Sequence, residues 1–237
     1  MFRPCLILAL LVSPPAIMAQ QDCFDRSDTS AYSALQLMHF CPGCNDGLPC
    51  RVVEFESLGI VSGSCYYFSV CSEFDTSRVD SSSDSSVTLR EIYRTVSLFE
   101  GPATGTPIER IWTTTAPAAL YRFGIPEMTK TRAGTFIHVS MTDTTGLEMG
   151  FYFLRSPHGW ISVDIPDWDK VLARYVPRGM RRDNNSRVDL KNMSVHFPLC
   201  REGDSPGVTS GDSLLVKLKI KSDEFVPAEV KFERNAR

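Results

Sequence analysis

The stretch LLVKLKIK (residues 214–221) decides the fold class, because apolar side chains and lysines alternate through most of it. Successive side chains of a β-strand point to opposite faces of the sheet, so this alternation indicates a strand with one buried and one exposed face. Lysines along the exposed face also discourage edge-to-edge pairing. The stretch GTFIHVSMT (134–142) has the same period, with Phe136, His138 and Ser140 on one face and Ile137, Val139 and Met141 on the other.

Residues 87–237 continue this pattern and form the predicted β domain. Clusters of Gly, Pro and Thr separate the apolar stretches at short intervals, as turns separate the strands of an antiparallel fold. Only WDKVLARYV (168–176) has a helical pattern, with Asp167 placed as an N-cap and Pro177 as a stop. About nine strands and one short helix predict a mainly β fold, an antiparallel β-sandwich or barrel. The other strand candidates of this domain are 92–99, 108–115, 119–123, 149–154, 160–163, 193–197 and 228–232.

A cysteine-rich region, residues 20–75, precedes the β domain and contains two short strand candidates, 51–55 and 65–71. Its six cysteines predict a small framework of disulfides in an oxidising compartment. The spacing does not choose among the possible pairings. Cys200 is then either joined to this region or unpaired, and the odd total leaves open a disulfide-linked dimer. The predicted disulfide cysteines are Cys23, Cys41, Cys44, Cys50, Cys65, Cys71 and Cys200.

Composition also marks the remaining boundaries. Residues 76–86 are rich in Ser and have almost nothing to bury, so they are the best candidate for a linker or long loop between the two regions. Residues 1–19 have a basic start, the apolar run CLILALLV and small residues before Gln20, which is the layout of a secretory signal peptide. Because the apolar run is too short to span a bilayer, we expect a secreted, extracellular protein without a membrane span.

Two Asn-X-Ser sequons lie in the C-terminal third of the chain, at Asn184 and Asn192. In a secreted protein both are candidate N-glycosylation sites, which would place this part of the chain on the surface. The net formal charge of −3 argues against a nucleic-acid partner, because nucleic-acid binding needs a basic surface.

Two motifs resemble catalytic sequences but stand in the wrong context. Cys41-Pro-Gly-Cys44 has the spacing of thiol–disulfide enzymes, yet turn residues follow it where that chemistry needs a helix N-terminus. Gly211-Asp-Ser-Leu214 matches the block that names the GDSL lipases and esterases, but here it leads into a strand rather than a helix. The four histidines lack metal-binding spacing, and Asp164, Asp167 and Asp169 lack the spacing of an EF-hand. We therefore predict no catalytic residue, metal site or cofactor.

The segment from Trp160 to Trp168 is the predicted partner-binding surface, because its prolines and acidic residues suggest exposure. Its candidate contact residues are Trp160, Asp164, Asp167 and Trp168. Together these features favour a secreted, N-glycosylated, non-enzymatic protein that binds an extracellular protein or glycan. A barrel with one late helix is also similar in outline to the lipocalins, carriers of small apolar ligands, although their Gly-x-Trp start is absent. A secreted hydrolase is the third alternative, and fold alone decides none of them.

Overall fold

The computed structural model describes residues 50–75, 90–102, 108–183, 186–205 and 212–234. Within these ranges the chain is mainly β, with three antiparallel sheets and one short helix, so the predicted fold class is confirmed at this level. Each strand candidate named above overlaps a strand of the structure. The strand at 214–221 also has one buried and one exposed face, as its alternation predicts: Val216 and Leu218 are buried, while Lys219 and Lys221 are exposed.

The first sheet consists of β1 (Cys50–Val61), β2 (Ser64–Asp75), β3 (Arg90–Pro102) and β4 (Glu109–Pro117), in that order. The β2–β3 ladder runs from Ser64 opposite Pro102 to Asp75 opposite Arg90. The linker predicted at 76–86 lies outside the described residues, but the strands on either side of it pair along their full length. Residues 50–75 therefore share a sheet with the strands that follow the predicted boundary.

The second sheet has the order β5-β7-β8-β9, and β6 also pairs with β7. Its β6–β7 hairpin is tight, because only Arg132 and Ala133 lie between the two strands. The strands are β5 (Tyr121–Phe123), β6 (Glu127–Thr131), β7 (Gly134–Asp143), β8 (Glu148–Ser156) and β9 (Gly159–Val163).

The third sheet has the order β10-β12-β13-β14, and β11 also pairs with β12. The strands are β10 (Met180–Arg182), β11 (Val188–Asp189), β12 (Ser194–Arg201), β13 (Ser213–Lys221) and β14 (Glu224–Glu233). A parallel bridge between Asp164 and Glu224 connects the end of the second sheet to β14.

Helix α2 (Trp168–Leu172) lies between the second and third sheets in the sequence. The carboxylate of Asp167 accepts hydrogen bonds from the backbone N–H groups of Asp169 and Lys170, so this residue is the N-cap that the sequence predicts. The helix is shorter than expected and ends at Leu172. The chain then turns, because the N–H of Tyr175 donates to the carbonyl of Leu172 across three residues.

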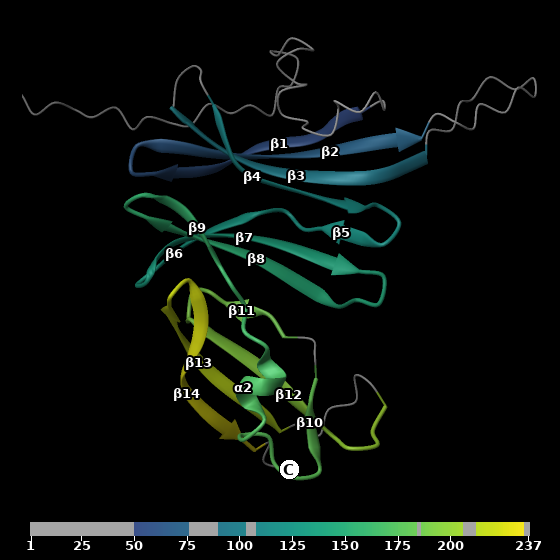
Figure 1. Cartoon of the computed structure of the whole chain (residues 1–237), viewed down its shortest axis with the longest axis vertical. Helices are drawn as coiled ribbons and strands as arrows, with labels where there is room; N and C mark the ends of the chain where they lie inside the picture. Colours follow the sequence, from purple (N-terminus) through teal and green to yellow (C-terminus); the bar gives the residue numbers. More distant parts are fainter. Residues whose placement is uncertain (1–49, 76–89, 103–107, 184–185, 206–211, 235–237) are drawn as a thin grey trace, which may run out of the picture.

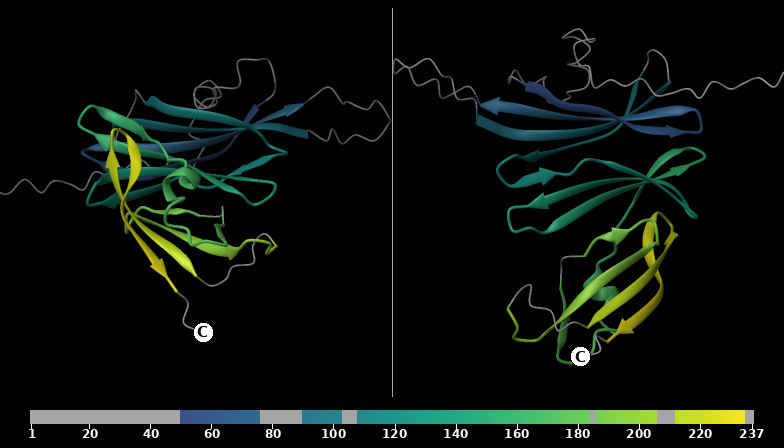
Figure 2. Two further views of the ribbon diagram at one scale, coloured as in Figure 1. Left: turned by 60° about the horizontal axis from the view of Figure 1, so that its bottom comes forward. Right: turned by 180° about the vertical axis from the view of Figure 1, so that it is seen from behind.

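The three sheets lie in successive layers (Figures 1 and 2). One core fills the space between the first and second sheets, and a second core joins the second sheet to α2 and the third sheet. The first core contains Val61, Tyr66, Phe68, Val70, Val96, Leu98, Ile137, Val139 and Phe153. The second contains Phe136, Tyr152, Val163, Trp168, Leu172, Val188, Leu190, Val195, Phe197, Leu199, Leu214, Val216, Leu218 and Phe225.

Strand β7 contributes to both cores. Ile137 and Val139 point into the first core, whereas Phe136 points into the second. Successive side chains of a strand point to opposite faces, so a strand that lies between two layers has both of its faces buried. His138 shares the second face with Phe136 and is 3% exposed. The middle sheet thus places a histidine at the boundary with the third sheet, where the candidate site lies.

Candidate functional site

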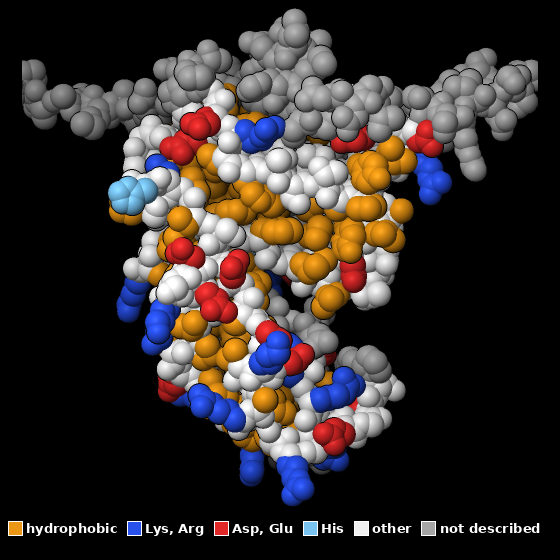
Figure 3. Space-filling model, viewed as in Figure 1, with side chains coloured by type: hydrophobic (Ala, Val, Ile, Leu, Met, Phe, Trp, Pro, Cys, Tyr) orange, Lys and Arg blue, Asp and Glu red, His pale blue; other side chains and the backbone are white. Residues whose placement is uncertain are grey.

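Two hollows lie where the third sheet meets the second, and we call this boundary the seam. Their volumes are about 370 and 420 Å³, and Arg187 and Val188 line both of them. Arg187 immediately precedes β11, the two-residue strand that pairs with the start of β12. The space-filling view shows the molecule hollowed below the second sheet (Figure 3). The seam is therefore a surface formed by residues far apart in the sequence.

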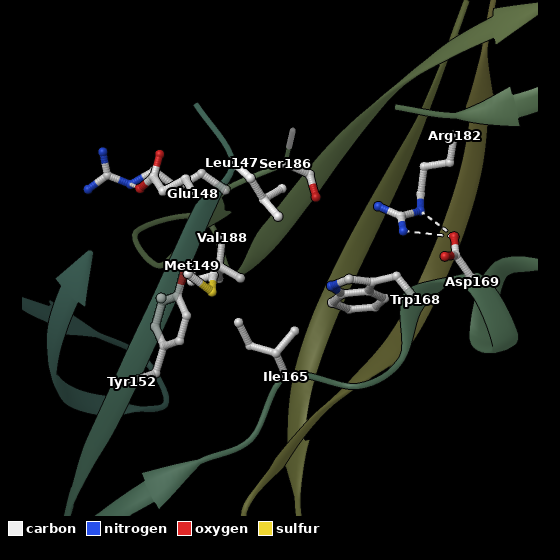
Figure 4. Close-up of a pocket in the computed structure, with 12 residues that line it drawn as sticks. Leu147, Glu148, Met149, Tyr152, Ile165, Trp168, Asp169, Arg182, Ser186 and Val188 are labelled. Atoms are coloured by element: carbon white, nitrogen blue, oxygen red, sulfur yellow. Dashed lines mark hydrogen bonds and ion pairs between the residues drawn. The ribbon is translucent and has the colours of Figure 1, made fainter. Parts of the chain in front are cut away.

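The apolar hollow, the smaller of the two, is lined by aliphatic side chains and the indole of Trp168. Figure 4 shows these side chains around a common space, with charged residues at its rim. Gly150 leaves room for the Tyr152 ring, because a Cβ atom at this position would lie 2.5 Å from a ring carbon. The lining residues are Leu147, Glu148, Met149, Gly150, Tyr152, Ile165, Trp168, Asp169, Arg182, Ser186, Arg187 and Val188.

The polar hollow lies on the other side of Arg187. Six of its eight lining residues are charged or polar, and they come from β6, β7 and the segment around β11. Its residues are Glu127, Thr129, His138, Arg187, Val188, Asp189, Leu190 and Lys191. Acidic and basic groups are both present, so this hollow offers hydrogen-bond donors and acceptors together.

Arg187 connects the third sheet to the second through ion pairs. Its guanidinium lies 3.2 Å from a carboxylate oxygen of Glu127, and its Nε lies 3.6 Å from one of Glu148. These carboxylates belong to β6 and β8, so the arginine bridges two strands of the middle sheet. The side chain of Arg187 is 48% exposed, which makes each pair worth only a fraction of a kcal/mol up to about 1 kcal/mol. Its position matters more than its energy, because it separates the two hollows.

His138 is buried beneath Arg187. Its ring stacks on Tyr152, its neighbour on β8, with centroids 4.6 Å apart. Its Nδ1 lies 3.4 Å from a guanidinium nitrogen of Arg187, and because a guanidinium only donates, Nδ1 is the acceptor. The proton of the neutral ring is then on Nε2, which is buried without a hydrogen-bond partner.

Burial and the nearby charge of Arg187 both disfavour the protonated ring and lower the pKa of His138 to about 4, although Glu127 opposes this shift. His138 is therefore neutral at physiological pH. Burial likewise raises the pKa of the stacked Tyr152 to about 12. A hydrogen bond between the backbone of Val188 and the Tyr152 hydroxyl opposes this rise in pKa. The same hydrogen bond attaches β11 to the second sheet.

The two tryptophans predicted to be exposed lie in or against the cores instead. Trp168 is 8% exposed and packs edge-on against Phe197, with centroids 5.2 Å apart. Trp160 is half-buried and packs edge-on against Tyr66, also at 5.2 Å. The expected exposure was wrong for Trp168, because the first turn of α2 directs its ring toward the third sheet, whereas Trp160 of β9 is only partly covered. Trp168 nevertheless lines the apolar hollow.

The two aspartates of the predicted surface are exposed but have structural contacts. Asp167 caps α2 and forms an ion pair with Lys170 at 2.9 Å. The backbone of Asp164 bonds to the β13–β14 turn: its N–H donates to the carbonyl of Asp223 and its carbonyl accepts from the N–H of Phe225. The structure thus does not gather the four predicted contact residues into one surface. Among the described residues, no cluster of three or more His, Cys, Asp or Glu side chains is placed to hold a metal ion.

The cysteines and sequons are described only in part. Cys50 and Cys65 each take part in a disulfide. Cys23, Cys41 and Cys44 lie outside the described residues, so the pairing within the region stays a prediction. Cys71 is buried. Cys200 is a fully buried free thiol, so the disulfide considered between it and the N-terminal region is not formed. Its burial also makes it unavailable for a bond to a second chain.

Of the two sequons, Asn192 is exposed in the turn after β11. Its side-chain amide donates to the carboxylate of Asp189 at 2.6 Å. Asn184 lies outside the described residues. Glycosylation of both asparagines therefore remains a prediction.

Sequence reasoning missed most of the seam. The face of β7 that carries His138 was predicted, but its contact with Arg187 was not, because 49 residues separate the two. Nothing in the pattern around Arg187, Glu127 or Glu148 marks them as neighbours. The one available signal was a histidine on the same strand face as Phe136, an apolar core residue.

Within the described ranges, no helix has the length and apolar character needed to cross a membrane. Comparison with known proteins adds no functional assignment. No protein-family model, no curated protein and no solved structure matches the chain.

Proposed function

We propose that this protein is secreted, N-glycosylated and stabilised by disulfides, and that it binds an extracellular protein or glycan at the seam without catalysing a reaction on it. The observation that carries the proposal is the pair of open hollows on either side of Arg187. They combine apolar surface with fixed charges, which is how binding sites provide both affinity and orientation. The first two sheets would act as a β-sandwich that supports this surface.

A lipocalin-like carrier is less well supported. Such a carrier needs an enclosed apolar cavity, whereas aromatic and aliphatic side chains fill the space between the first and second sheets. A hydrolase is also less well supported, because Ser213 of the Gly-Asp-Ser-Leu motif is buried at the start of β13 instead of leading into a helix. The binding proposal is therefore the one the geometry favours.

The test is an array of extracellular proteins and glycans probed with the secreted protein and two variants. Arg187→Met removes the charge between the hollows and should weaken binding of the array ligand at least tenfold. Arg178→Met is the matched control, because Arg178 is exposed and lines neither hollow. Equal binding by both variants would place the binding surface elsewhere. A hydrolytic activity of the purified protein that Ser213→Ala abolishes would replace the proposal with an enzyme.

A further inference from the structure

We propose that the apolar hollow is an anchor pocket for one aliphatic or aromatic side chain of a partner polypeptide, so that the ligand of the seam is a protein and not a glycan. This inference rests on the proposed function and specifies its ligand class. It follows from three properties of the hollow: the exposure of its aliphatic residues, the burial of its aromatic residues and the pairing of its charges.

The aliphatic residues of the hollow are unusually accessible. Leu147 and Ile165 are 38% and 39% exposed, and they come from separate elements, the end of the β7–β8 turn and the segment before α2. Met149 and Val188 complete an apolar floor between them. Apolar side chains that gather in a concave surface gain free energy when a further apolar group covers them, by roughly 25 cal/mol for each Å² removed from water.

The aromatic rings of the hollow are not available for stacking with a sugar. A sugar binds an aromatic side chain by laying its C–H face on an open ring face. Tyr152 is 3% exposed and one of its faces is covered by His138, while Trp168 is 8% exposed. The hollow therefore offers aliphatic surface and very little accessible ring surface, which suits an apolar side chain better than a carbohydrate.

The charges at the rim are already paired with each other. Asp169 lies 2.8 Å from the guanidinium of Arg182, whose Cζ also lies over the Phe197 ring, 5.0 Å from its centroid. Glu148 lies 3.6 Å from Nε of Arg187. A charged anchor would have to compete with one of these pairs, whereas a neutral side chain enters without disturbing them. The volume of about 370 Å³ lies at the lower end of the range for ligand pockets, which fits one large side chain and its flanking backbone.

The test uses capped amino acids as probes and the methyl signal of Met149 as the reporter. N-acetyl-leucinamide and N-acetyl-phenylalaninamide should shift this methyl resonance at millimolar concentration, whereas N-acetyl-lysinamide and diacetylchitobiose should not. Ile165→Asp and Leu147→Asp should each weaken the shift at least fivefold, because each places a charge in the apolar floor. Both positions are partly exposed, so the variants are expected to fold, which the remaining resonances will show.

Ile125→Asp is the matched control, because Ile125 is 62% exposed but lines neither hollow. Its variant should respond to the probes like the wild type. The inference is overturned by any of three results: no probe shifts the Met149 signal, the lysine amide shifts it as much as the leucine and phenylalanine amides, or only the sugar shifts it. The array result with Arg187→Met stands apart from these outcomes, since a seam that binds glycans would satisfy the proposed function and contradict this inference.

Discussion

At the scale of single residues, His138 is the group whose surroundings have the clearest measurable effect. Burial and Arg187 keep its ring neutral in the folded protein, whereas the unfolded chain exposes the ring to water. The pKa of about 4 in the folded protein lies below the ordinary value of 6.5. Between these two values the unfolded state binds a proton that the folded state does not. Acidification therefore favours unfolding through this residue.

We predict that His138 contributes stability that is fully present above about pH 6.5 and is lost as the pH falls toward 4. The full loss corresponds to about 3 kcal/mol of unfolding free energy. His138→Phe keeps an aromatic ring on Tyr152 but cannot titrate, so it should remove this part of the pH dependence. Urea unfolding at several pH values measures the difference between the two proteins. His158→Phe, in the exposed β8–β9 turn, is the control and should follow the wild type. Parallel pH profiles for wild type and His138→Phe would show that His138 is not the cause.

At the scale of elements, α2 holds the third sheet and the connection from the second sheet together. Trp168 and Leu172 are the buried residues of this short helix, and Trp168 contacts Phe197 of β12. Few other side chains extend from the helix into this core. The helix is too short to be stable by itself, so its packing residues maintain it.

We predict that Trp168→Ala lowers the free energy of unfolding by about 3–5 kcal/mol, the usual cost of removing a large buried aromatic side chain. Secretion should fall with it, because unstable proteins are retained and degraded. Chemical unfolding and the secreted yield measure the two effects. Leu120→Ala, at a 51% exposed position, should change stability by no more than about 0.5 kcal/mol. A Trp168→Ala protein that is secreted normally and has lost only partner binding would restore the surface role for this tryptophan.

The elements also show how far the sequence alone could reach. Strong alternation predicted β7 and β13, and an Asp before an apolar run predicted the cap of α2. Strands β6, β10 and β11 were missed. Two or three residues in β10 and β11 are too few to show a period, and β6 (EMTKT) contains a single apolar residue. The exposure of Trp168 was wrong for a different reason: its burial depends on β12, whose position no local pattern reveals. The candidate site was likewise unpredictable, because its residues meet only through the packing of two sheets.

At the scale of the whole molecule, the β2–β3 ladder joins the cysteine-rich region and the β domain into one unit. Twelve pairs of residues face each other along it, and Phe68 and Leu98 of these strands lie in the first core. Backbone hydrogen bonds and apolar packing thus join residues 50–75 to the β domain independently of the covalent connection at 76–86. Stability on the two sides of this segment should be coupled.

We predict that cutting the chain within 76–86 leaves the protein assembled. A protease site inserted between Ser82 and Ser83 and cleaved after folding should give fragments that elute together and unfold in a single calorimetric transition. The same chain left uncut is the control for the insertion itself. Two transitions, or release of the N-terminal fragment without denaturant, would show that residues 50–75 form a separate domain.

The position of β7 between two cores also limits how the gene for this protein can change. A single codon gained or lost within β7 would move Ile137 and Val139 to the face that now carries Phe136, and would exchange the side chains that β7 contributes to the two cores. Such a change is lost from a population because the product does not fold. A codon gained in the β8–β9 turn, where Pro157 and His158 are exposed, disturbs neither core. We therefore expect changes of length to be accepted in the turns and not in β7.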